Sequence, residues 1–175
     1  VSLLLTLFSV GIGLGSLLCR KIGGSAVNIK MVPFGMLGLT VFAFYLAISL
    51  TCIPPMTGER LGIADLFNHG ASYYHVMLSV SLLGISGGFY IVPLYAMMQA
   101  YSPRSHRARV VAANNILNAV FMVSSAVFSI IILSVLNIEI HILFCITAVL
   151  SALFSIWLLK RLKQLMRQTQ SNLEN

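Results

Sequence analysis

The chain has 175 residues, of which 58% are hydrophobic and only 9% are charged, and its mean hydropathy is +0.95. Soluble domains carry roughly 25% charged residues, so this composition excludes an ordinary soluble protein and indicates one that lies in a lipid bilayer. The net charge of +7 could suggest nucleic acid as a partner. However, the basic residues stand at the ends of apolar stretches and in short loops, which favours lipid headgroups and no nucleic acid.

Five long apolar stretches divide the chain, and each is close to the length of about 20 residues that a helix needs to cross a membrane. An open sheet is excluded because lipid offers no partner for unpaired backbone groups. The sequence therefore predicts an all-α fold, a polytopic membrane bundle of five transmembrane helices, with a basic cytoplasmic tail. The predicted spans are residues 1–19, 33–53, 74–100, 110–136 and 142–159, and the predicted tail is 160–175.

The basic residues are sorted among the connections between these spans. The connections after the second and fourth spans hold Arg60 together with Glu59, Asp65 and Glu139. Cationic loops of membrane proteins stay in the cytoplasm, so we expect the start of the chain outside and the C-terminus in the cytoplasm. The other ten basic residues follow the first, third and fifth spans: Arg20, Lys21, Lys30, Arg104, Arg107, Arg109, Lys160, Arg161, Lys163 and Arg167.

The two ends of the chain support further interpretations. The sequence opens at Val1 directly in an apolar run without a charged leader, which favours a fragment of a larger protein over a signal peptide. In the tail, apolar residues alternate with basic ones, as in a helix that lies along the inner membrane surface on anionic lipid. A frayed, solvated stop signal explains the same pattern equally well.

Small residues are concentrated in the first and third spans. Those of the first span, in the run from Gly11 to Ser16, would let another helix approach closely, as small residues do in lipid. In the third span a proline removes a backbone donor from a stretch weakened by glycine, so we predict a hinge there, with a merely structural kink as the alternative. The hinge candidates are Gly84, Gly87, Gly88 and Pro93.

A polar stripe runs along the fourth span. Asn114, Asn118, Ser125 and Ser129 recur at intervals of four, seven and four residues, so they share one helical face, with Asn115 beside it. Polar groups are costly against lipid, and this face should therefore meet other helices or a wet cavity. Hydrogen bonds between helices alone would explain the stripe. The cavity interpretation makes Asn114, Asn118 and Ser125 the candidates for a substrate path.

Enzyme chemistry and metal binding are not indicated by the sequence. No ionisable residue lies deep in a span, and no spacing of His, Asp or Glu forms a metal site or an acid–base pair. The three cysteines have no CxxC spacing, which argues against zinc and against a disulfide framework. We therefore expect no catalytic residue, no metal and no cofactor, and we expect His75, His106 and His141 at the membrane interfaces or in a loop.

Residues 15–23 resemble a signature of the major facilitator superfamily, which lies at the inner end of the second helix of each six-helix half. The matching positions are Gly15, Arg20 and Gly23. This resemblance makes the five spans helices eight to twelve of such a transporter, with the N-terminal half as a missing partner. The signature usually has an acidic residue where this chain has Cys19, which argues against a charge-paired inner gate.

Residues 87–96 and 109–119 are similar to the lysophospholipid transporter branch of that superfamily. Some members of the branch are fused to acyl-carrier-protein synthetase and glycerophospholipid acyltransferase domains. The resemblance implies alternating access that moves lysophospholipid across the bacterial inner membrane for reacylation. The alternatives are another substrate, such as a drug or a metabolite, the transporter part of a fused enzyme, and a non-functional truncated remnant.

Overall fold

The computed structural model describes residues 2–23, 31–52 and 71–174, and this part of the chain is helical and contains no strand. Five of its helices are long and apolar enough to cross a membrane. The predicted all-α bundle is therefore confirmed. The elements are α1 (Ser2–Gly23), α2 (Val32–Thr51), α4 (Ala71–Tyr101), α5 (Arg107–Ile130), the π-helix η2 (Ile131–Val135) and α6 (Ile140–Glu174).

The helix bounds differ from the predicted spans mainly at the C-terminal end. The apolar part of α6 ends at Arg161, but the helix continues to Glu174, so the backbone of the predicted tail is helical as far as it is described. The start of α2 follows a local signal, since Pro33 lies in its first turn, where the fixed φ of proline suits a helix and its missing N–H is not needed. Pro54 and Pro55, which cannot continue a helix, follow the predicted second span and lie outside the described residues.

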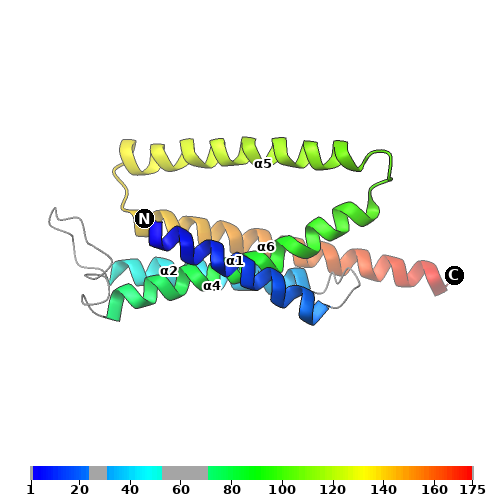
Figure 1. Ribbon diagram of the computed structural model, residues 1–175, viewed down its shortest axis with the longest axis horizontal. Coiled ribbons are helices and arrows are strands. Elements are labelled where there is room, and N and C mark those ends of the chain that lie inside the picture. The colour runs from blue at the N-terminus through cyan, green and yellow to red at the C-terminus, as the bar shows by residue number, and fades with distance from the viewer. Residues whose placement is uncertain (1, 24–30, 53–70, 175) are drawn as a thin grey trace.

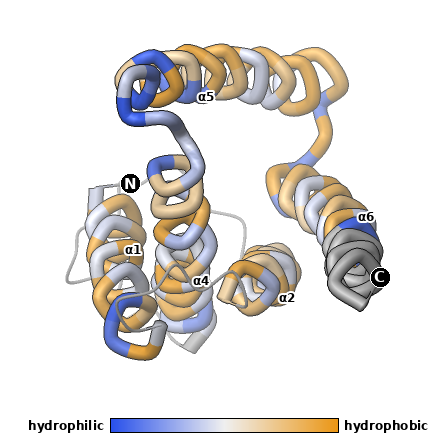
Figure 2. Tube along the Cα trace, turned by 90° about the vertical axis from the view of Figure 1, so that its right-hand side faces the viewer, coloured by the Kyte–Doolittle hydropathy of each residue, from blue (hydrophilic) through white to orange (hydrophobic). Residues whose placement is uncertain are grey.

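Four helices lie side by side in the order α1, α4, α2 and α6 (Figure 2), and α4 packs against both α1 and α2. The fifth helix, α5, stands apart from this row and spans the distance between the end of α4 and the start of α6 (Figure 1). The row is therefore the packed part of the molecule, and within it α4 lies between α1 and α2.

Four glycines allow α1 and α4 to approach each other closely. Gly11 and Gly15, one turn apart on α1, meet Gly84 and Gly88, one turn apart on α4. A Cβ atom on Gly88 would lie 2.7 Å from the carbonyl oxygen of Ile12, which real Cβ atoms essentially never do. Helices in lipid associate largely through this kind of close packing. The close approach predicted for the first span is confirmed, and we call these four residues the glycine interface.

The other contacts of the row are made by α2, which uses small and hydroxylated residues on both sides. A Cβ atom on Gly35 would lie 2.8 Å from the Cα of Tyr90 in α4. Towards α6, the hydroxyl of Thr40 forms hydrogen bonds with the hydroxyls of Ser151 at 3.1 Å and Ser155 at 3.5 Å. Such interhelical bonds contribute on the order of 0.6 kcal/mol each, so they supplement the packing of α2 and do not dominate it.

The packing of α5 is sparse by comparison. None of its residues is buried, and large apolar side chains such as Phe121 and Met122 are 69% and 71% exposed. The helix passes into η2, and Asn137 then adopts a left-handed backbone with φ of 50°, a conformation that asparagine tolerates better than most residues. This turn leads the chain into α6, so α5 is fixed mainly at its two ends.

Candidate functional site

A single hydroxyl group joins α5 to α4. The side-chain amide of Asn114 donates a hydrogen bond to the Tyr95 hydroxyl oxygen at 2.9 Å, and the amide of Asn118 donates to the same oxygen at 3.3 Å. Asn114 and Tyr95 are half-buried, and Asn118 is exposed. We call these three residues the polar cluster.

The local helix geometry explains how the cluster forms. Asn114 and Asn118 lie one turn apart on α5, so both amides project from the same face. Tyr95 comes from the second half of α4, two residues after the buried Pro93. Tyr95 cannot be identified from the sequence, because a tyrosine in an apolar helix carries no signal of the asparagines that it will meet. It does fall within the stretch 87–96 that carries the family resemblance.

The hydrogen-bonding capacity of the cluster is only partly used. Because both amides donate to the Tyr95 oxygen, the Tyr95 proton is available to a further acceptor, and the side-chain carbonyl oxygens of the two asparagines are available to a further donor. The cluster can therefore bind a group that both donates and accepts hydrogen bonds. It supplies no charge of its own.

The serines of the predicted stripe do not join the cluster. The hydroxyl of Ser125 donates to the carbonyl oxygen of Met122 at 2.9 Å, and that of Ser129 donates to the carbonyl oxygen of Ser125 at 2.8 Å. Both hydroxyls are thus satisfied by their own helix. Ser125 stays a predicted lining residue, and the structure does not bring it to Tyr95.

The hinge candidates occupy three different environments. Gly84 and Gly88 belong to the glycine interface, whereas a Cβ atom on Gly87 would meet no described atom within 4 Å. Pro93 is buried, and α4 runs as one helix from Ala71 to Tyr101 through it. The role of Gly84 and Gly88 in packing is therefore visible, and the hinge itself stays a prediction that rests on Gly87 and Pro93.

The signature residues of the first span lie along α1. Gly15 is in the glycine interface, and Gly23 is the last residue of the helix. Arg20 is exposed in the last turn, where a cation interacts favourably with the helix dipole. Cys19, which takes the place of the usual acidic residue, is 5% exposed. Within α1, Arg20 therefore interacts with the C-terminal end of the helix dipole and not with an acidic neighbour at position 19.

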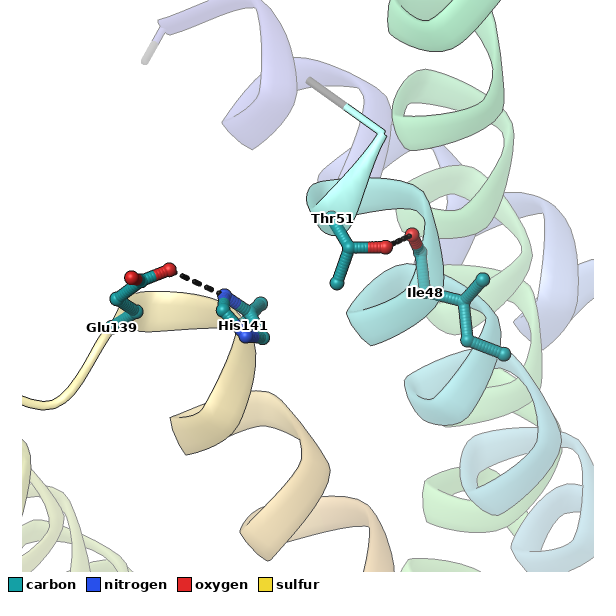
Figure 3. Close-up of polar contacts among 4 residues, drawn as sticks. All are labelled: Ile48, Thr51, Glu139 and His141. Atoms are coloured by element: carbon teal, nitrogen blue, oxygen red, sulfur yellow. Dashed lines mark hydrogen bonds and ion pairs between the residues drawn. The ribbon is translucent and has the colours of Figure 1, made fainter. Parts of the chain in front are cut away.

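Two histidines lie at the opposite end of the bundle from Arg20. Nδ1 of His75 is 2.6 Å from the Tyr45 hydroxyl, and Nδ1 of His141 is 3.1 Å from a carboxylate oxygen of Glu139. Figure 3 shows the second pair near the end of α2, where Thr51 donates a hydrogen bond to its own helix. Within the described parts of the chain, no three His, Cys, Asp or Glu residues come together in a way that could hold a metal ion.

Comparison with known proteins places this arrangement in a family. The family model of the Major Facilitator Superfamily matches residues 1–172, nearly the whole chain. No curated protein and no solved structure matches the chain. The members of the superfamily are membrane transporters, in agreement with the five apolar helices described above. This chain therefore belongs to the major facilitator superfamily and is a membrane transporter of that type.

Proposed function

We propose that the chain supplies helices eight to twelve of a transporter that moves lysophospholipid across the bacterial inner membrane by alternating access. The C-terminus then lies in the cytoplasm, as the sorting of basic residues favours. The observation that carries the proposal is the polar cluster, in which uncharged hydrogen-bonding groups from two helices converge beside a sparsely packed apolar helix. In the proposal, the cluster faces the substrate path.

The charge distribution supports an amphiphilic substrate. In the described spans the charged side chains stand only near the ends of the apolar spans, as at Arg20, Arg107 and Lys160, so the middle of the bundle offers hydrogen bonds but no ion pair. A lysophospholipid suits this environment, because its polar headgroup can bind the cluster while its single acyl chain lies along exposed apolar side chains such as Phe121. The resemblance of residues 87–96 and 109–119 to the lysophospholipid branch supports the same substrate.

The test is uptake of a radiolabelled lysophospholipid by the full-length protein in proteoliposomes. Asn118→Leu removes one cluster amide, and the loss of an uncharged hydrogen bond corresponds to about 1 kcal/mol, so the transport rate should fall roughly fivefold. The matched control is Asn115→Leu, which removes an exposed amide outside the cluster on the same helix. Its rate should match that of the unchanged protein.

Two results would count against this function. Equal uptake by the Asn118→Leu and Asn115→Leu proteins would remove the cluster from the substrate path. Transport of a drug or a metabolite by the unchanged protein, with no uptake of lysophospholipid, would keep the transporter but assign it another substrate.

A further inference from the structure

The cations of the described side chains lie at one end of the bundle. Figure 1 shows the C-terminal end of α1, the connection between α4 and α5, and the later part of α6 at the same end. The described acidic side chain, that of Glu139, lies at the other end, in the connection between η2 and α6. We call this set of cations the basic end: Arg20, Lys21, Arg104, Arg107, Arg109, Lys160 and Arg161.

The protein itself does not neutralise these charges. All seven side chains are exposed, and no carboxylate among the described side chains forms an ion pair with any of them. Arg107 donates one hydrogen bond from Nε to the backbone oxygen of Ser102 at 3.2 Å, which leaves the rest of its guanidinium free. The basic end therefore needs counterions from its surroundings.

The position and spread of the charges identify the counterion. Because the helices cross a membrane, their ends lie at the level of the lipid headgroups. Figure 2 looks at this end and shows hydrophilic regions spread over α1, the start of α5 and α6, not gathered at one point. A spread of this kind matches a layer of separate phosphates better than a single soluble anion. The helix α6 also continues beyond the apolar span, from Arg161 to Glu174, with Lys163 and Arg167 among its residues.

We propose that the basic end is a binding surface for anionic phospholipid headgroups, which it selects over zwitterionic ones. This inference does not depend on the transported substrate. Each Lys or Arg near an anionic membrane surface contributes about fivefold in binding. Two neighbouring cations, Lys160 and Arg161, should therefore produce a preference that is large enough to measure at α6 alone.

Trp157 provides a reporter at this place. It lies one turn before Lys160 and Arg161, is 58% exposed, and is the single tryptophan of the sequence. The experiment reconstitutes the protein in phosphatidylcholine vesicles that contain increasing fractions of phosphatidylglycerol. In one series of vesicles phosphatidylglycerol carries brominated acyl chains, and in a second series phosphatidylcholine does. Comparing the quenching of Trp157 fluorescence in the two series gives the relative binding constant of the two lipids. The protein Trp157→Phe supplies the background signal.

The expected result is a severalfold preference of the unchanged protein for phosphatidylglycerol, which weakens at high salt because ions screen exposed charges. Lys160→Gln with Arg161→Gln should bring the relative constant towards one. The charge-preserving pair Lys160→Arg with Arg161→Lys should retain the preference. Circular dichroism and the elution volume in detergent check that each variant is folded. Equal quenching by the two lipids in the unchanged protein would overturn the proposal, as would a preference that Lys160→Gln with Arg161→Gln leaves undiminished.

Discussion

The two sides of α4 are built in opposite ways. Towards α1, Gly84 and Gly88 meet the backbone of the neighbouring helix so closely that no side chain fits between them. Towards α5, Tyr95 holds two asparagine amides across a sparsely packed contact, and none of the α5 residues is buried. The face towards α1 therefore leaves no room for a side chain. The face towards α5 presents polar groups whose hydrogen-bonding capacity is only partly used.

This difference separates two roles within one helix. Backbone atoms in close contact repel each other steeply when they are pushed closer. The packing of α1 against α4 therefore resists movement of one helix relative to the other and stabilises this pair. A contact made through one hydroxyl is weak and can be exchanged for another hydrogen-bonding group. We accordingly expect changes on the α1 side to affect folding, and changes on the α5 side to affect transport.

The largest effect is expected at the glycine interface. In Gly15→Leu the new Cβ would collide with the backbone carbonyl of Ile85, and overpacking of this kind costs about 1–3 kcal/mol or more. The variant should melt at a clearly lower temperature in detergent or fail to accumulate. The matched control is Gly13→Leu on the same helix, where an added Cβ meets no described atom within 4 Å. Similar melting of both variants would contradict the packing role.

A smaller effect is expected at the hinge candidate. Gly87 has open space around it in the described structure, so Gly87→Leu should leave the melting temperature nearly unchanged. If α4 bends here during transport, the bulkier side chain should slow turnover severalfold while substrate binding changes little, because a hinge acts on the conformational step. Gly88→Leu, one residue along, should instead destabilise the fold. Normal turnover of the Gly87→Leu protein would remove the hinge.

The smallest effect is expected between α2 and α6. Thr40→Val removes the hydroxyl that bonds Ser151 and Ser155 while keeping the shape of the side chain. A loss in stability of about 0.6 kcal/mol for each of these two bonds and an unchanged transport rate are expected. The variant serves as a control for the polar cluster, because the interhelical hydrogen bonds that it removes lie outside the cluster. A large loss of transport would show that the polar cluster is not distinguished from other interhelical hydrogen bonds by a role in transport.

The bundle could be predicted from the sequence because the membrane imposes simple rules on length and hydropathy. Each span must be apolar and long enough to cross the hydrocarbon, and five of the described helices meet both conditions. For the end of α6 the sequence left two interpretations open, a continued helix and a frayed stop signal, and the structure has the helix continuing past Arg161, where the apolar span ends. Hydropathy indicates where a span leaves the hydrocarbon, whereas the end of a helix depends on backbone hydrogen bonds, which can continue outside the hydrocarbon.

The candidate site could be predicted only in part. A helical pattern shows which residues share one face of a helix, but not which residues of another helix that face contacts. The spacing of Asn114 and Asn118 predicted that they share one helical face, but their common partner Tyr95 depends on how α4 and α5 are placed in space. Likewise, Gly87 and Gly88 are neighbours in the sequence and differ by about 100° around the helix. That rotation puts Gly88 against α1 and leaves Gly87 open.

We propose that Tyr95 and Asn114 act in transport through the hydrogen bond that they share at 2.9 Å. A double-mutant cycle with Tyr95→Phe and Asn114→Leu tests this most directly, with lysophospholipid uptake as the rate and melting temperature as the check on folding. We predict that each single variant slows uptake severalfold and that the double variant is no slower than the worse single one. The control Tyr90→Phe, which removes a hydroxyl elsewhere on α4, should have no effect. Multiplicative losses in the double variant, or full transport by Tyr95→Phe, would contradict the claim.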